Sequence, residues 1–154
     1  MRQQKTLKYR QKNSGNIEHV FPLLCPVREK DWIDGWDYRM IHSKSGLIEQ
    51  DCVFSTDYTN EIQSIWFVTQ YNKIEHCIEF VKFTPGVNAI KINIEVSEID
   101  NENCHSMIYY QYTSLCVEQD HFIQKELDEN FQANMQYWEK AINHYLKTGE
   151  KLKK

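Results

Sequence analysis

An acidic cluster surrounds two tryptophans in the first quarter of the chain. The cluster consists of Glu29, Asp31, Asp34 and Asp37, and the tryptophans are Trp32 and Trp36. A carboxyl group held against aromatic surface can have a raised pKa and act as a general acid. The pattern favours a simpler interpretation, in which the carboxylates keep a loop solvated while the tryptophans pack. In a further alternative, the two tryptophans form a lip over the entrance to an interior cavity.

A single thiol near a cation is the one candidate nucleophile. Cys25 lies three residues before Arg28, and a nearby cation lowers the pKa of a thiol. No histidine lies beside it as a base, and Pro22 and Pro26 flank it, so a role in packing a turn is favoured. The five cysteines of the chain contain no C-x-x-C pair. We therefore expect reduced thiols and a cytoplasmic protein.

Two pairs of soft metal ligands, His76-Cys77 and Cys104-His105, fall on predicted strands. Zinc is bound by such side chains in a tetrahedral arrangement. Adjacent residues of a strand point to opposite faces, so neither pair can chelate a metal on one side of a sheet. The chain also has no glycine-rich phosphate loop and no nucleophile-elbow motif. We expect no metal and no cofactor, and the sequence identifies no catalytic residue.

Most of the chain before residue 116 has the period-two alternation of half-buried β-strands. The clearest example is residues 88–99, where Ile90, Ile92, Ile94 and Val96 alternate with polar residues. Weaker versions of the pattern predict further strands. These cover residues 6–11, 36–43, 48–56, 62–71, 74–83 and 104–115.

The connections between these strands contain recognisable turn and cap residues. Residues 14–16 offer helix N-caps before an apolar stretch at residues 17–24, which Pro22 and Pro26 limit to short helical pieces. Thr84-Pro85-Gly86 has the order that a type II turn requires. Within residues 74–83, the alternation predicts one shared face for four side chains. These are Ile74, His76, Ile78 and Phe80.

From about residue 120 the apolar spacing changes to steps of three and four. The apolar residues are Ile123, Leu127, Phe131, Met135, Trp138, Ile142 and Tyr145. Asp120 is a suitable N-cap and Gly149 a suitable C′ residue. The spacing predicts one helix over residues 120–147, about 40 Å long. Its apolar stripe needs a matching surface, and the concave face of the preceding antiparallel sheet is the candidate.

This element order is that of a helix-grip fold. We expect one α+β domain over residues 1–154, with a curved antiparallel sheet of about seven strands wrapped around the long C-terminal helix. Two short helices follow the first strand. A cone of the ketosteroid-isomerase type begins with its long helix and fits poorly. A lipocalin barrel needs more strand sequence and a Gly-x-Trp near its first strand, whereas Gly35 and Trp36 are adjacent.

Three segments resemble a known superfamily. Residues 20–36, VFPLLCPVREKDWIDGW, are similar to the region after the first strand of SRPBCC or START-like proteins, above all those of a polyketide-cyclase-like bacterial subgroup. Residues 80–96 and 130–149 are similar too. The resemblance implies a helix-grip domain with a hydrophobic cavity between the sheet and the long helix. Members of the superfamily bind lipids, sterols, hormones or polyketides, or act as co-chaperones, and only some are enzymes.

The resemblance and the predicted facing elements together define a candidate ligand-binding set. It consists of Trp66, Ile78, Phe80, Ile92, Tyr110, Tyr112, Phe131, Met135 and Trp138. The leading hypothesis is a binding protein for a small hydrophobic or amphipathic molecule, which apolar burial would hold and a few polar groups would orient.

Two alternatives remain open on sequence alone. One is a cyclase- or dehydratase-like enzyme that uses His76 with Tyr110 or Tyr112 as an acid–base pair. The other is a protein-interaction module of the co-chaperone kind, with the outer sheet face or exposed Trp32 and Trp36 as the contact. A homodimer also remains open.

Composition and charge exclude several function classes. The net charge of −4 comes without the clustered bases that nucleic-acid binding requires. No apolar run approaches the roughly 18 residues of a membrane span, and the N-terminal MRQQK precedes no apolar region of a signal peptide. Four Trp, nine Tyr and seven Phe favour a well-packed core.

Overall fold

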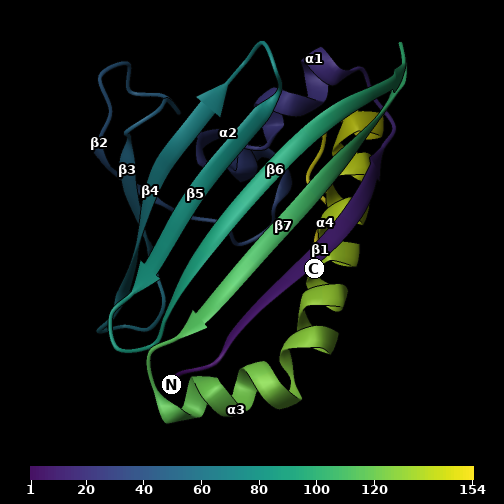
Figure 1. The fold of residues 1–154 in the computed structure, drawn as a ribbon. Helices are drawn as coiled ribbons and strands as arrows, with labels where there is room; N and C mark the ends of the chain where they lie inside the picture. The colour runs from purple at the N-terminus through teal and green to yellow at the C-terminus, as the bar shows by residue number, and fades with distance from the viewer.

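A curved antiparallel sheet of seven strands forms one layer of the protein (Figure 1). The computed structural model covers residues 1–154. The strand order is β1-β7-β6-β5-β4-β3-β2, so the first strand pairs with the last and the others form a meander. The strands are β1 (Gln4–Asn13), β2 (Arg39–His42), β3 (Val53–Asp57), β4 (Gln63–Asn72), β5 (Cys77–Thr84), β6 (Asn88–Asp100) and β7 (Asn103–Ser114).

Three short helical pieces separate β1 from β2. They are α1 (Ile17–Val20), the 3-10 helix η1 (Phe21–Leu23) and α2 (Pro26–Trp32). The Asn16 side chain caps α1 by accepting the amide of Glu18. Pro22 and Pro26 stand in the first turns of η1 and α2, where a missing amide donor has no cost. This arrangement confirms the short helices predicted after the first strand.

The C-terminal helical region differs from the single helix that the spacing predicts. It consists of α3 (Val117–Lys125) and α4 (Leu127–Thr148), which meet at Glu126 with φ −124° and ψ −23°. Figure 1 shows α3 turned away from the axis of α4. Asp120 is not an N-cap, because it lies in the first turn of α3 and accepts hydrogen bonds from the Gln3 amide and from Arg2. The predicted C′ glycine is correct, since Gly149 has a φ of 72° and follows α4.

The break at Glu126 has a tertiary cause. Neither glycine nor proline lies there, and Ile123 and Leu127 on its two sides are both buried. Asp120 ties α3 to the start of β1, while α4 packs along β1 itself. The apolar stripe therefore continues across two helices that point in different directions.

The inner face of the sheet carries the predicted apolar side chains of β6 and most of those of β5. Ile90, Ile92 and Ile94 are buried, and the residues between them are exposed or partly exposed. The prediction for residues 74–83 is wrong at its start. Ile74 is exposed and His76 has a φ of 55°, because both lie in the turn that precedes β5.

The sheet, α2 and α4 share one core. Leu127, Phe131 and Met135 of α4 are buried in it, as the helical spacing predicts. Trp32 of α2 meets Trp138 of α4 edge to face, with 5.3 Å between ring centroids. The tryptophan pair therefore joins the short N-terminal helix to the long C-terminal one above the concave sheet.

Candidate functional site

A small cavity of about 30 Å³ lies between the sheet, α2 and α4. Its lining comes from every layer of the fold and is mostly aromatic. The lining residues are Pro26, Glu29, Trp36, Phe54, Trp66, Phe80, Ile92, Ile94, Tyr110 and Trp138. A cavity needs about 10–15 Å³ of such space to hold one water molecule, whereas pockets for drug-sized ligands measure about 300–1,000 Å³. Side chains must move before a ligand of that size can enter.

Ring contacts set the shape of this cavity. Trp66 stacks on Phe54 at 5.4 Å and meets Phe80 edge to face at 6.0 Å. Its indole nitrogen donates to the Thr56 hydroxyl, and the indole nitrogen of Trp36 donates to the carbonyl of Pro26. These two hydrogen bonds satisfy the indole N–H groups and leave the ring faces for apolar contact.

The nine residues predicted to bind ligand divide into two groups. Trp66, Phe80, Ile92, Tyr110 and Trp138 line the cavity. The other four pack around it rather than facing it. Ile78, Phe131 and Met135 are buried in the surrounding core, and Tyr112 stacks on Tyr110 at 5.9 Å.

Glu29 is the residue that the sequence interpretation placed wrongly. It is 6% exposed, lines the cavity and has no hydrogen bond or ion pair to its carboxyl group. Burial raises the pKa of Glu29 to about 8. Asp31 and Asp37 of the same acidic cluster do lie at the surface, where they pair with Arg28 and Lys30.

One signal in the sequence identifies the buried position of Glu29. Pro26, Glu29 and Trp32 follow one another at steps of three within α2, and all three are buried. That spacing places them on one helical face. The spacing reveals the burial of Glu29 only once the helix boundaries are known, because the acidic neighbours otherwise indicate a solvated loop.

Two further polar groups reach the inner face from the sheet. Burial raises the pKa of Tyr110 far above its ordinary value, with a smaller effect from the negative charge of Glu29. Lys82 of β5 pairs across the sheet with Trp66 and Ile90, and its ammonium lies 5.0 Å from the centroid of the Trp66 ring. Burial lowers the pKa of Lys82.

The predicted acid–base pair of His76 with Tyr110 or Tyr112 is not formed. His76 lies in the β4–β5 turn, where its Nε2 is 2.9 Å from the carboxylate of Glu18. Its carbonyl accepts the amide of Val96. Val96 is four residues along β6 from Ile92, the partner of Tyr110, which corresponds to about 13 Å.

A second hollow, of about 220 Å³, lies on the other side of α2. It is lined by Pro22, Cys25, Val27, Arg28, Leu47, Ile48, Tyr71 and Lys73. Burial raises the pKa of the Cys25 thiol to about 11, so the sulfur is a thiol rather than a nucleophilic thiolate at neutral pH. The two hollows both reach the start of α2, where the neighbouring residues Cys25 and Pro26 line one each.

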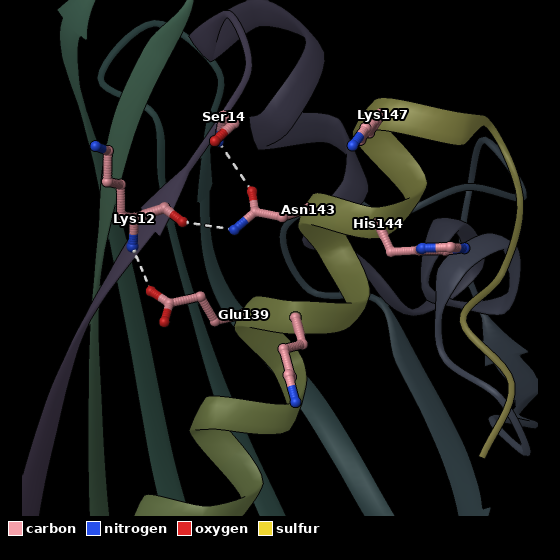
Figure 2. Close-up of a pocket in the computed structure, with 7 residues that line it drawn as sticks. Lys12, Ser14, Glu139, Asn143, His144 and Lys147 are labelled. Atoms are coloured by element: carbon pink, nitrogen blue, oxygen red, sulfur yellow. Dashed lines mark hydrogen bonds between the residues drawn. The ribbon is translucent and has the colours of Figure 1, made fainter.

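A surface hollow of about 540 Å³ has no hydrophobic lining. Figure 2 shows it between the end of β1 and α4. The Asn143 side chain donates to the Lys12 carbonyl and accepts the Ser14 amide, while Glu139 accepts the Lys12 amide. These side chains satisfy the free edge of β1, which indicates a structural role for the groove.

The structure contains no disulfide and no cluster of metal-ligating side chains. All five cysteines are free, and no three His, Cys, Asp or Glu side chains gather in a way that could hold a metal ion. Cys77 and His105 lie on β5 and β7, which β6 separates. None of the helices has the length and apolar character needed to cross a membrane.

The chain is similar to known proteins in its three-dimensional structure but not detectably in its sequence. No family model and no curated protein matches the sequence. The Zhui aromatase/cyclase from Streptomyces sp. R1128 superposes with a TM-score of 0.70 at 9% identity, over 97% of this chain and 100% of that one. Norcoclaurine synthase from Thalictrum flavum, in complex with dopamine and hydroxybenzaldehyde, has a TM-score of 0.65 at 7% identity, over 94% of this chain and 87% of that one.

A third solved structure extends the same likeness. Ara h 8.0201 has a TM-score of 0.62 at 9% identity and covers 93% of this chain and 97% of its own. All three structures share the curved sheet and the long C-terminal helix of the SRPBCC/START-like group. The chain therefore has the helix-grip fold of SRPBCC/START-like proteins, as its sequence predicts.

Proposed function

We propose that the protein binds one small, largely apolar ring compound between the sheet, α2 and α4. The observation that carries the proposal is the convergence of six aromatic side chains on one interior space, together with an unpartnered carboxyl group. Covering about 200 Å² of apolar ligand surface contributes about 5 kcal/mol, enough to offset part of the cost of association.

Entry requires the cavity to widen, and Trp36 is the side chain best placed to allow it. Trp36 lies in the loop after α2, is partly exposed, and meets Trp66 edge to face at 6.1 Å. The lip predicted from Trp32 and Trp36 is therefore wrong for Trp32, which is completely buried, and stays a proposal for Trp36. The burial of Trp32 also removes it from any protein-interaction surface.

A second candidate function is catalysis on such a ring compound. The observation that favours it is Glu29, a buried acid in a cavity, because a carboxyl group with a pKa near neutrality can donate and recover a proton. The structures named above include an aromatase/cyclase and norcoclaurine synthase. Recovery of a cyclised or dehydrated product after incubation would favour this candidate over simple binding.

Native mass spectrometry of protein purified from its own host tests the binding proposal first. We expect a bound small molecule, and a thermal-shift screen of fatty acids, sterols, flavonoids and aromatic polyketides should find at least one stabiliser. At 100 times its Kd a ligand adds about 2.7 kcal/mol of stability.

A pair of matched variants tests whether a stabilising ligand binds in the cavity. Ile92→Trp places bulk in the cavity, whereas Ile99→Trp makes the same change at an exposed position of the same strand. Ligand stabilisation should fall for the first variant and persist for the second. Equal responses of both variants, or no stabiliser in any class, would contradict binding in this cavity.

A further inference from the structure

Two polar groups face the interior cavity without a partner in the protein. Glu29 approaches from α2 and Tyr110 from β7, and both line the same space. The carboxyl group of Glu29 makes no hydrogen bond or ion pair, although the residue is only 6% exposed. An unpaired polar group in an apolar interior costs about 1–3 kcal/mol, so a bound molecule that pairs it recovers free energy.

The charge state of Glu29 decides what it can recognise. Burial raises its pKa to about 8, so the group is mostly a neutral carboxylic acid at pH 7 and offers a hydrogen-bond donor. Tyr110 from β7 and Cys25 from the start of α2 are the titratable groups beside it, and burial keeps both protonated. Lys82 from β5 is the cation on the same inner face of the sheet.

We propose that the Glu29 carboxylic acid and the Tyr110 hydroxyl donate hydrogen bonds to one oxygen of the ligand, which is an aromatic ketone or a related carbonyl compound. The inference rests on the proposed function and names its ligand class. Two donors converging on one acceptor would also fix how the ring system lies among Trp66, Phe80 and Trp138.

The alternative occupant is an aromatic amine, which would pair with an ionised Glu29. The arrangement of charge on the inner face argues against it. The ammonium of Lys82 already lies over the face of Trp66, and that ring also lines the cavity. A second cation would meet this positive charge and would compete for the same aromatic face.

Three probes of one ring system separate these possibilities. They are 2-acetylnaphthalene, which carries a carbonyl oxygen; 2-ethylnaphthalene, which carries none; and 1-(2-naphthyl)ethylamine, which is a cation. Titration by tryptophan fluorescence at pH 6.5 should give the ketone about tenfold tighter binding than the hydrocarbon, which is the worth of one or two net hydrogen bonds. At pH 9.5 the preference should fall, because Glu29 then has no proton to donate and the Tyr110 hydroxyl is the remaining donor.

Variants assign the preference to the two residues. Glu29→Gln keeps an N–H donor, so it should retain a ketone preference and lose the pH dependence. Glu29→Leu and Tyr110→Phe should each reduce the ratio of ketone affinity to 2-ethylnaphthalene affinity, with both affinities measured on the same variant. Circular dichroism of each variant checks that it folds, and the Gln and Phe variants change the shape of the core least.

The outcomes distinguish this inference from the function on which it rests. Equal affinity of wild-type protein for ketone and hydrocarbon at both pH values overturns the carbonyl assignment and leaves apolar binding intact. Tightest binding of the amine, growing as Glu29 ionises, overturns it in favour of a cationic ligand. Failure of all three probes to bind overturns both the inference and the proposed cavity for ring compounds.

Discussion

Glu29 of α2 and Tyr110 of β7 face one interior cavity from opposite layers of the fold. Neither side chain forms a hydrogen bond or ion pair with another residue, and the walls around them are mostly aromatic. Burial of the Glu29 carboxyl group without a hydrogen-bond partner disfavours its charged form and lowers the stability of the empty protein near neutral pH. A binding role for the cavity explains why the core contains them.

Glu29→Gln should stabilise the empty protein in a pH-dependent manner. The folded-state pKa of Glu29, about 8, lies above its ordinary value of 4.5, so the folded chain holds this proton more tightly than the unfolded chain. The stabilising effect of that proton is complete below about pH 4.5 and is lost as the pH rises through 8. Relative to wild type, the variant should gain roughly 2–4 kcal/mol near pH 7 and little at pH 4.

Urea denaturation across this pH range measures the difference. Asp31→Asn is the matched control, because Asp31 lies on the exposed side of the same helix in a half-exposed pair with Arg28. The control should change the free energy of unfolding by less than about 1 kcal/mol. A difference between Glu29→Gln and wild type that stays constant from pH 4 to pH 9 would show that Glu29 is not a buried acid.

Truncation of the apolar stripe on α4 should destabilise the fold strongly. Phe131 is 3% exposed and its ring lies 5.3 Å from that of Tyr110, so Phe131→Ala should cost about 3–5 kcal/mol. Gln132→Ala, at the next and exposed position, should change stability by less than about 0.5 kcal/mol. Thermal and urea unfolding of both variants check the contrast, and similar losses would show that α4 is misplaced on the sheet.

Much of this architecture could be predicted from sequence because its signals are local. The alternation through Ile90, Ile92 and Ile94 identifies the buried face of β6, and Gly149 ends α4 in the left-handed conformation that glycine favours. These features depend on neighbours within a few residues. The element order then allows few topologies, of which the helix-grip fold is one.

The features that sequence analysis missed depend on distant contacts. The break at Glu126 occurs without glycine or proline and follows from the attachment of Asp120 to the amide of Gln3, 117 residues away. His76 is a local exception, because its φ of 55° places it in the turn directly before β5. The burial of Glu29 depends on the sheet that covers it, which its acidic neighbours in sequence do not reveal.

Asn143 should act as a substitute for a neighbouring strand at the free edge of β1. Its amide group joins the Lys12 carbonyl and the Ser14 amide at 2.9 Å each (Figure 2). Asn143→Leu removes both bonds and should cost about 1–3 kcal/mol. Hydrogen exchange at the Ser14 amide should also accelerate, whereas Lys140→Ala in the same groove should leave it unchanged. Unaltered exchange in Asn143→Leu would contradict this role.

Methyl NMR of the isoleucine side chains tests the central claim most directly. Ile92 and Ile94 line the cavity, and Ile41 and Ile74 are exposed on other parts of the surface. Titration with the compound that raises the melting temperature most in the ligand screen should shift the methyl signals of Ile92 and Ile94 and leave those of Ile41 and Ile74 in place. Saturation that moves only the exposed methyl groups, or the absence of any stabilising compound, would contradict a ligand site between the sheet and α4.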